Sequence, residues 1–305
     1  MSDESVLMQM LQHCSLCPRD CKVDRLIGKK GYCKESSQLV VARSALHMWE
    51  EPCISGKEGS GTVFFSGCSM GCVYCQNNNI AQGKAGKMIT VERLSDIFLE
   101  LQGKRANNIN LVTPTHYVPH IIAALDQARG KGLHLPIVYN CSGYEKVETL
   151  DLLEGYVDVY LPDFKYKNPK LAKQYSNCED YFEYAVQAIK KMLCQVGEPT
   201  FDERGMMRKG VIVRHLAMPG YSQDSKEIIK YLYATFGDSI YLSIMNQYTP
   251  MPNATSYPGI NRKLTEEEYE ELVNYAIEIG VENGFIQEGE TATESFIPEF
   301  NGEGV

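Results

Sequence analysis

The sequence lacks any apolar run close to the roughly 20 residues that cross a bilayer, and its polar start, Met1 to Gln12, does not match a signal peptide. Low-complexity segments are absent as well. These absences favour a cytoplasmic protein. The hydrophobic content is sufficient for the core of a folded protein, because 44% of the 305 residues are hydrophobic. That length suits one barrel-sized domain or two smaller ones.

Lysine, arginine and aspartate are missing from residues 264–305, where twelve glutamates lie. The net charge of the chain is -9, so residues 1–263 carry +3. The run from Glu266 to Glu271 predicts a solvated helix face. The rest of the chain has no basic stripe with interleaved aromatic residues, so neither a nucleic acid nor a membrane is indicated as a partner.

Cysteine, in contrast, is abundant, with eleven residues. In a cytoplasmic protein this number indicates metal or redox chemistry rather than disulfides. Cys68, Cys72 and Cys75 form a C-x-x-x-C-x-x-C loop after a β-branched and aromatic segment. Three thiolates can hold a 4Fe-4S cluster and leave one iron open. The alternatives are a zinc ion with three cysteines and a water, or three buried thiols.

A second group, Cys14, Cys17, Cys21 and Cys33, lies in a segment rich in Gly, Lys and Arg. That segment has little apolar periodicity, and four thiolates on a metal would supply folding energy that it otherwise lacks. The spacing does not separate zinc from a second iron-sulfur cluster. A thioredoxin-like redox pair is less favoured because no strand precedes the first cysteine. Cys141, Cys178 and Cys194 are expected to be small buried hydrophobes. Cys53 has no obvious partner.

From residue 61 onward, the strand and helix periods alternate. Strands are expected at 61–66, 109–113, 135–140, 157–162, 210–216 and 239–245, and helices at 91–104, 117–130, 144–154, 179–196, 224–236 and 265–280. Short connections predict an α/β fold, a partial barrel of six parallel strand-helix units. We divide the chain into an N-terminal cysteine-rich metal-binding segment (1–40), a connector (41–60), a barrel core (61–263) and an acidic C-terminal helix with an extension (264–305).

The carboxyl ends of parallel barrel strands meet at one mouth, where such barrels place their chemistry. Polar side chains follow every predicted strand, which a merely structural barrel would not need. The candidates to hold a polar ligand are Thr113, Thr115, His116, Asn140, Ser142, Asp163, Lys165, Arg214, His215 and Gln247.

The strand, the glycine-flanked cysteine loop and the aromatic Tyr74 before the last cysteine together resemble the radical S-adenosylmethionine (SAM) superfamily. The resemblance implies a partial barrel of radical SAM type in which SAM chelates the open iron. It also implies that an electron from the reduced cluster cleaves SAM to methionine and a 5′-deoxyadenosyl radical. Tyr74 and the polar residues at the strand ends would then contact SAM.

The strand ends resemble more closely the activating enzymes of glycyl radical enzymes, in the branch similar to the pyruvate formate-lyase activating enzyme. Asp163 and Lys165 match an Asp-x-Lys of that family, which implies SAM contacts, and His215 lies in a matching Arg-His-x-x-x-Pro-Gly. The sequence departs from that family at two strand ends. The third strand ends in Asn-Cys-Ser-Gly instead of Asp-Thr-Asn-Gly, so a cation site beside SAM stays unassigned. At the second strand, Thr-Pro-Thr-His stands where Gly-Gly-Glu is common.

We therefore expect an anaerobic oxidoreductase that abstracts a hydrogen atom, from a glycine of a glycyl radical enzyme partner, with flavodoxin or ferredoxin as electron donor. No catalytic side chain is assigned. One alternative is a radical SAM enzyme that modifies a small molecule or peptide, with an auxiliary N-terminal cluster. Another is an electron-transfer or redox-sensing protein that does not cleave SAM and uses Cys53 or Cys141 as its fourth ligand. The residues expected to cap the barrel or contact a partner are Phe285, Phe296, Ile297 and Phe300.

Overall fold

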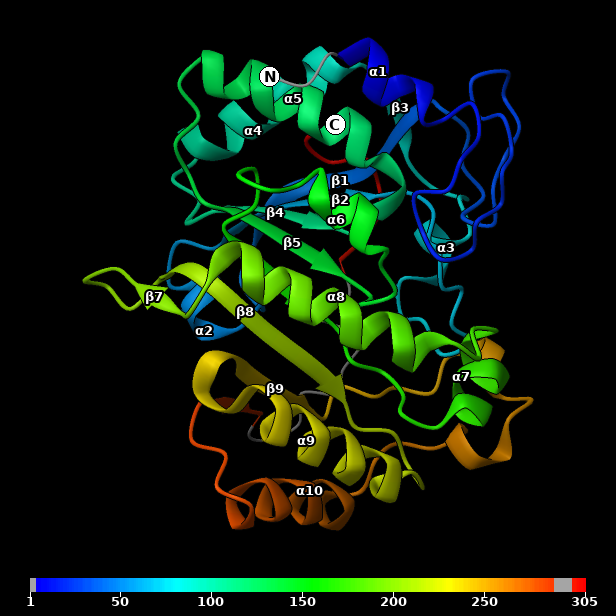
Figure 1. Ribbon diagram of the computed structural model, residues 1–305, viewed down its shortest axis with the longest axis vertical. Helices are drawn as coiled ribbons and strands as arrows, with labels where there is room; N and C mark the ends of the chain where they lie inside the picture. Colours follow the sequence, from blue (N-terminus) through cyan, green and yellow to red (C-terminus); the bar gives the residue numbers. More distant parts are fainter. Residues whose placement is uncertain (1–3, 288–297) are drawn as a thin grey trace.

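The computed structural model describes residues 4–287 and 298–305 (Figure 1). The strands are β1 (Leu39–His47), β2 (Ser60–Phe65), β3 (Lys87–Ile89), β4 (Ile109–Val112), β5 (Ile137–Cys141), β6 (Val159–Pro162), β7 (Thr200–Phe201), β8 (Met207–Leu216), β9 (Tyr241–Met245) and β10 (Gly284–Ile286). The α-helices are α1 (Glu4–Gln9), α2 (Pro52–Ser55), α3 (Asn78–Ala81), α4 (Val91–Gly103), α5 (Val118–Gly130), α6 (Val147–Asp151), α7 (Pro169–Ser176), α8 (Tyr181–Val196), α9 (Ser222–Phe236) and α10 (Glu266–Glu278).

All six predicted strand-helix units are present, as β2-α4, β4-α5, β5-α6, β6-α8, β8-α9 and β9-α10. The described strands form one sheet in the order β10-β9-β8-β6-β5-β4-β2-β1-β3, with β7 paired only to β8. Neighbours from β2 to β10 run parallel. Local chemistry supports the helix starts: Thr90 caps α4, and Thr265 and Glu268 form a capping box on α10.

The two faces of the sheet are covered differently. On β6, Tyr160 packs in the cluster that contains residues of α8 and α9, whereas Val159 and Leu161 pack with Cys53 and Ile54 of α2. A doubly wound sheet would carry long helices on both faces, but here the long helices cover one face and the short α2 lies against the other. The sheet is thus a partial α/β barrel, and the interior of the barrel, on the α2 side of its strands, is called the lumen below.

Helix α2 closes the lumen at the end where the strands begin. Asn108, which directly precedes β4, donates its side-chain amide to the Ile54 carbonyl at 2.8 Å. Asn107 donates likewise to the Ser55 carbonyl at 2.6 Å. The open end is therefore the one at the carboxyl ends of the strands, where the cysteine loop follows β2.

The segment 41–60, predicted as a connector, contains regular structure. Residues 39–47 form β1, which pairs antiparallel with β2 and with β3, and residues 52–55 form α2. Strand β1 is only half-buried along its last residues, so its pattern lacks the continuous apolar run of the central strands.

The C-terminal residues return to β1. The Glu303 carbonyl accepts the Ser44 N–H at 2.9 Å, and the Gly302 N–H donates to the Ala42 carbonyl at 3.1 Å. Phe300 packs edge-on against Phe64 of β2. Phe285 lies in β10 and stacks on Tyr241 of β9, whereas Phe296 and Ile297 lie outside the described residues.

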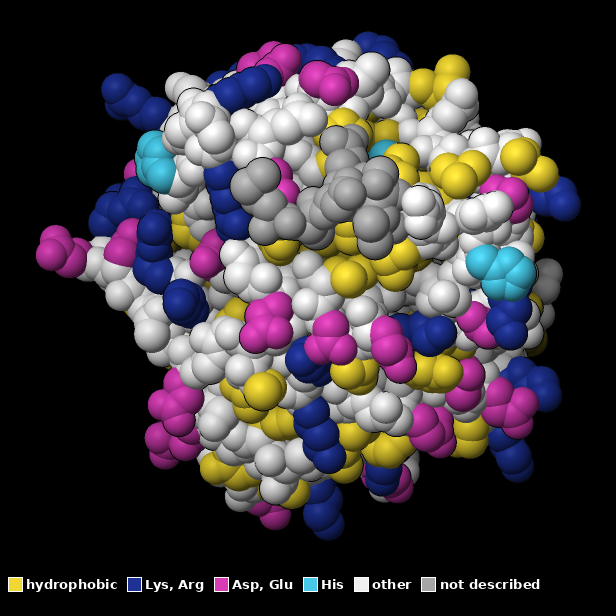
Figure 2. Space-filling view, turned by 45° about the horizontal axis from the view of Figure 1, so that its top comes forward, with side chains coloured by type: hydrophobic (Ala, Val, Ile, Leu, Met, Phe, Trp, Pro, Cys, Tyr) yellow, Lys and Arg dark blue, Asp and Glu magenta, His cyan; other side chains and the backbone are white. Residues whose placement is uncertain are grey.

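Acidic and basic side chains are interspersed on the face shown in Figure 2, without a continuous stripe of one sign. Among the described residues, no helix combines the length and the apolar character that a membrane span requires.

Candidate functional site

The cysteine loop starts where β2 ends, and its glycines are required by their surroundings. Gly67 adopts a φ of 87° and Gly71 a φ of 66°, the left-handed region that glycine tolerates. A Cβ on Gly67 would lie 2.6 Å from the Cys33 carbonyl oxygen. The N–H of Cys68 donates to that same oxygen at 3.3 Å. The loop is therefore packed directly against the N-terminal cysteine segment.

The three loop thiols lie among groups that suit thiolates. The Met70 N–H points at the Cys68 sulfur, 3.4 Å away, and the Ser176 hydroxyl donates to the Cys72 sulfur at 2.9 Å. Burial raises the pKa of the free Cys75 thiol, and the neighbouring Cys68 and Cys72 raise it further. Lys165 acts in the opposite direction on Cys75. Hydrogen-bond donors and an ammonium group around three clustered thiols fit an anionic, thiolate-bound cluster.

In the part of the chain that the structure describes, no three Cys, His, Asp or Glu side chains converge as ligands of one metal ion must. Thiolates of a four-iron cube bind different irons and are spread more widely. The three loop cysteines could each bind a different iron of such a cube. For the N-terminal cysteines, a zinc ion would have to draw the four thiols closer together.

The N-terminal segment, residues 14–38, is built of turns around a small apolar cluster of Leu11, Cys14 and Leu16. The sulfurs of Cys33 and Cys21 both lie next to Gly31, since a Cβ there would be in ordinary van der Waals contact with them at 3.5 Å and 3.6 Å. The Tyr32 N–H donates to the Cys21 sulfur at 3.2 Å. This environment also fits thiolate ligands.

Arg25 is the charged anchor of this segment, and sequence reasoning missed it. Its side chain is completely buried and donates to the carbonyls of Ser36 at 2.6 Å and His116 at 2.7 Å. A buried guanidinium needs a negative counter-charge. Cys14 places its sulfur 3.8 Å from the guanidinium, so a metal-bound thiolate there would supply that charge.

Arg19, also missed, joins the two cysteine regions. It lies between Cys17 and Cys21, and its guanidinium donates to the carbonyls of Ser69 at 2.7 Å, Ser176 at 2.8 Å and Met70 at 3.2 Å, and also to that of Asn177. The guanidinium stacks on Tyr32, with its central carbon 3.9 Å from the ring centre. One side chain thus fixes the cluster loop and the end of α7 to the N-terminal segment.

A group of charged and amide side chains crosses the lumen, and we call it the lumen charge layer: Glu50, Glu51, Asn110, Asn140, Asp163 and Arg214. Arg214 of β8 donates to Asp163 at 3.0 Å, to Glu50 at 3.2 Å and to the Asn140 side-chain oxygen at 2.6 Å. Asp163 also accepts from Lys165 at 2.6 Å. Burial opposes the ionisation of Asp163, but Lys165 and Arg214 outweigh it and lower its pKa.

Four predicted site residues are thus brought together, namely Asn140, Asp163, Lys165 and Arg214. Lys165 also links the charge layer to the cysteine loop. Burial alone would lower the pKa of Lys165, but Asp163 raises it, and Cys72 and Cys75 raise it further. The layer includes Glu50, Glu51 and Asn110, which sequence reasoning missed. The two glutamates stand in the segment taken for a connector, and only their adjacency to a buried helix could have pointed to them.

The two predicted histidines lie elsewhere. His215 is buried with one ring nitrogen 2.7 Å from the Phe164 carbonyl and the other 2.8 Å from the Ser225 hydroxyl of α9. It therefore lies on the helix side of β8, opposite Arg214. His116 is buried with a ring nitrogen 2.6 Å from the Ser66 carbonyl, under the cysteine loop. Burial is the main cause that lowers the pKa of His215 to about 4 and that of His116 to about 3.

The remaining predicted residues surround these groups. Thr115 is buried and donates to Glu145, whose pKa burial raises to about 8. Thr113 is half-buried with a φ of 58°, and the Ser142 carbonyl accepts from Tyr181. The Tyr74 hydroxyl accepts from Tyr166 at 2.6 Å, and the Gln247 carbonyl accepts from the Gln76 amide at 2.7 Å. None of the residues in this paragraph belongs to the lumen charge layer.

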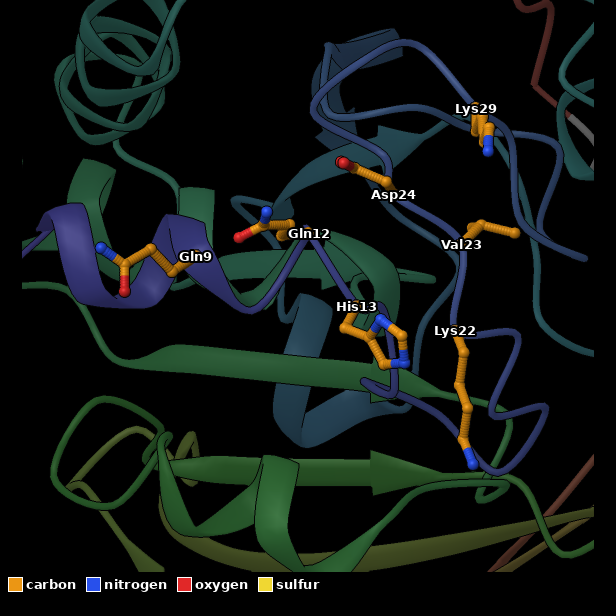
Figure 3. A pocket seen from close by; sticks show the side chains of 7 residues that line it. All are labelled: Gln9, Gln12, His13, Lys22, Val23, Asp24 and Lys29. Carbon is orange, nitrogen blue, oxygen red and sulfur yellow. The ribbon is translucent and has the colours of Figure 1, made fainter.

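A hollow of about 590 Å³ lies beside the N-terminal segment, at α1 and the turns that follow it (Figure 3). Its lining includes His13, Lys22 and Asp24 but none of the predicted thiolate ligands.

Three further cysteines were predicted to be small buried hydrophobes. This prediction is right for Cys141 and Cys178, which are buried, and wrong for Cys194, which is exposed on α8.

Comparison with known proteins gives a family and a fold. A family model described as the Radical SAM superfamily matches residues 62–232. An uncharacterized protein of Methanocaldococcus jannaschii is 30% identical over 279 residues, which cover 89% of this chain and 76% of that protein.

Solved structures resemble the chain at lower identity. Streptococcus suis SuiB bound to its precursor peptide SuiA gives a TM-score of 0.51 at 13% identity over 75% of this chain and 48% of SuiB. HydG, a maturase of the [FeFe]-hydrogenase, gives 0.50 at 15% identity over 75% of this chain and 52% of HydG. The chain spans about half the length of these structures, and at such identities the likeness shows the fold alone.

Proposed function

This chain belongs to the radical SAM superfamily, and we propose that it cleaves SAM reductively and uses the resulting 5′-deoxyadenosyl radical to abstract a hydrogen atom from a substrate. The observation that carries the proposal is the position of the cysteine loop. Cys68, Cys72 and Cys75 follow β2 at the open end of a lumen whose other end is closed by α2. A 4Fe-4S cluster on these three thiolates would supply the electron and leave one iron for SAM.

The protein's own side chains hold and shield the reactants in this proposal. Lys165 lies between the cysteine loop and Asp163 of the lumen charge layer, and in this proposal these two residues would bind the polar amino acid part of SAM. The apolar cluster of α2 with β5, β6 and β8 keeps water from entering through the floor. We assign no protein acid or base, because the chemistry belongs to the cofactors and the chain positions them.

We further propose a second metal site at Cys14, Cys17, Cys21 and Cys33. The position of the Cys21 and Cys33 sulfurs beside Gly31 and the buried guanidinium of Arg25 next to Cys14 support it. The metal is zinc or an iron-sulfur cluster. About eight irons per chain would indicate two cubanes, whereas about four irons with one zinc would indicate a structural site.

Two substrate classes follow from different observations. The match of Asp163, Lys165 and the Arg214-His215 sequence to the activating enzymes supports a glycine of a glycyl radical enzyme partner, with flavodoxin or ferredoxin as electron donor. The lumen charge layer, which lies inside the barrel, favours a small molecule or a peptide side chain that reaches deep into the barrel. A protein that only transfers electrons would need a fourth ligand such as Cys53, which packs instead in the apolar floor.

The test is 5′-deoxyadenosine formation by anaerobically reconstituted protein with dithionite and SAM. Cys72→Ala should abolish the product, because it removes one of three cluster ligands. Cys194→Ala is the matched control, since that cysteine is exposed and far along α8. It should retain the wild-type rate.

The outcomes separate the alternatives. Product that requires Cys72 supports SAM cleavage. An intact cluster whose electron paramagnetic resonance spectrum does not respond to SAM, with no product, would refute the proposal and support electron transfer or redox sensing.

A further inference from the structure

Three buried hydroxyl groups form a chain that ends on one sulfur of the cysteine loop, and we call them the hydroxyl chain: Tyr74, Tyr166 and Ser176. They come from the loop itself, from the segment after β6 and from the last residue of α7. Their exposed fractions are 5%, 1% and 2%, so the chain is shielded from water. The Ser176 hydroxyl donates to the Cys72 sulfur at 2.9 Å. The Tyr166 oxygen lies 2.8 Å from the Ser176 oxygen and 2.6 Å from the Tyr74 oxygen.

Cys72, where the chain ends, has surroundings that differ from those of the other loop cysteines. Among the described residues, it is the loop cysteine whose sulfur accepts a hydrogen bond from a side chain. The Cys68 sulfur faces the backbone N–H of Met70 at 3.4 Å. A backbone N–H is held by the loop, whereas a serine hydroxyl rotates and keeps one direction only when a second group holds it. The Tyr166 hydroxyl is in position to be that second group.

Each hydroxyl carries one proton, so the protons of the chain can be counted against its three contacts. In the structure Ser176 donates to Cys72 and Tyr166 donates to Tyr74, which leaves no proton for the contact between Tyr166 and Ser176. A metal-bound thiolate accepts and does not donate, so the Ser176 proton stays on the sulfur. When Tyr166 donates to Ser176 and Tyr74 donates to Tyr166, each contact holds one proton and all three protons point toward Cys72.

We propose that Tyr166 is a positioning residue for the loop cluster, which directs the Ser176 hydroxyl onto the Cys72 sulfur through the hydroxyl chain. The inference rests on the proposed function only in taking Cys72 as a thiolate ligand of the cluster. Hydrogen bonds to the sulfurs are among the groups that set the reduction potential of a cluster, and donors raise it because they stabilise the more negative reduced state. Bonds in a chain also polarise one another, by roughly 10–30% per bond, so Tyr166 strengthens the bond that Ser176 makes.

The experiment is a potentiometric titration of anaerobically reconstituted protein without SAM, followed by electron paramagnetic resonance. The loop cluster is the signal that Cys72→Ala removes, which separates it from any signal of the N-terminal site. In Tyr166→Phe the ratio of reduced to oxidised loop cluster at a fixed potential should fall about twofold. This fall corresponds to a midpoint potential lower by roughly 18 mV, at about 59 mV per tenfold change in a one-electron couple.

The matched control is Tyr248→Phe. Tyr248 is as buried as Tyr166, and its ring also packs against that of Tyr74, with the ring centres 6.0 Å apart. Its hydroxyl, however, donates to the Ile260 carbonyl at 2.6 Å and is not part of the chain. The control variant should therefore keep the wild-type potential.

The decisive variant is the double substitution of Tyr166→Phe with Ser176→Ala. Because Tyr166 acts through Ser176, the double variant should have the same potential as Ser176→Ala alone, whereas independent packing effects would add. Tyr74→Phe removes the far end of the chain and should lower the potential by less than Tyr166→Phe does. It carries the test if Tyr166→Phe binds little iron.

Three results would overturn the inference: an unchanged potential in Tyr166→Phe, or in Tyr74→Phe where that variant replaces it; an equal shift in Tyr248→Phe; or additive shifts in the double variant. Failure of the inference and failure of the proposed function are distinguishable. Formation of 5′-deoxyadenosine by a protein whose potential ignores Tyr166 removes only the inference. The expected shifts without SAM cleavage remove the proposed function and leave the role of Tyr166.

Discussion

The two cysteine regions differ in what holds them in place. The loop of Cys68, Cys72 and Cys75 follows a strand whose six residues are all buried. The N-terminal cysteines lie in turns, with Asp20, Lys22 and Lys34 in the left-handed backbone region that non-glycine residues adopt only under constraint. The barrel therefore positions the first region before any cofactor binds. The second region depends on side-chain anchors and, we infer, on a metal.

The contact between the regions runs through few groups. The Cys33 carbonyl accepts the Cys68 N–H, and Arg19 donates to the Ser69 carbonyl in the cluster loop and to the Ser176 carbonyl at the end of α7. A change in the N-terminal segment should thus reach the loop, whereas the barrel should hardly respond. The predictions below test this asymmetry, from the largest expected effect to the smallest.

The largest effect is expected for Cys33→Ala. Structural zinc contributes apparent binding energies of about 10–16 kcal/mol to small domains, and a cluster plays the same part. Loss of one ligand should lower the metal content and leave residues 14–38 open to proteolysis, while the barrel stays resistant. Metal analysis and limited proteolysis measure both, with Cys194→Ala as the control. If residues 14–38 of the metal-free variant resist proteolysis as well as they do in the wild type, the N-terminal segment is as preformed as the loop.

A smaller effect is expected for Arg19→Gln, which removes a charged donor from four backbone carbonyls. Bonds from charged donors are worth roughly 1.5–3 kcal/mol, and this one is half-buried, so we expect a loss of about 2 kcal/mol in unfolding free energy. The spectrum of the loop cluster with SAM should also broaden because the loop is held less rigidly. Arg19→Lys, which keeps the charge, should recover part of both. A change in stability with an unaltered spectrum would contradict the link to the loop.

The smallest effect is expected for Ser176→Ala. Its hydroxyl bonds the Cys72 sulfur and would stabilise the more negative, reduced cluster. A bond of about 0.5–1.5 kcal/mol corresponds to a fall in midpoint potential of roughly 20–60 mV in a one-electron couple. Ser225→Ala is the control, because that hydroxyl bonds His215 instead. An equal shift in both variants would show a general packing effect.

The barrel was predictable because its elements carry periodicity. Strands such as β4 and helices such as α4 show their apolar patterns locally, and Thr90 marks a helix start. Glu50, Arg19 and Arg25 were not predictable in this way. Their partners are carbonyls and carboxyls far along the chain, and no local pattern encodes such contacts. Both Arg214 and His215 were candidates, but only Arg214 lies in the charge layer, because strand alternation turns adjacent residues to opposite faces and His215 bonds Ser225 of α9.

The closed floor formed by α2 has a consequence for the order of turnover. Under the proposed function, SAM at the cysteine loop would stand between the open end of the barrel and α2. A substrate held on the floor would have to enter before SAM covers it, and its product would wait until methionine and 5′-deoxyadenosine have departed. Product inhibition by 5′-deoxyadenosine would then trap the modified substrate inside the protein.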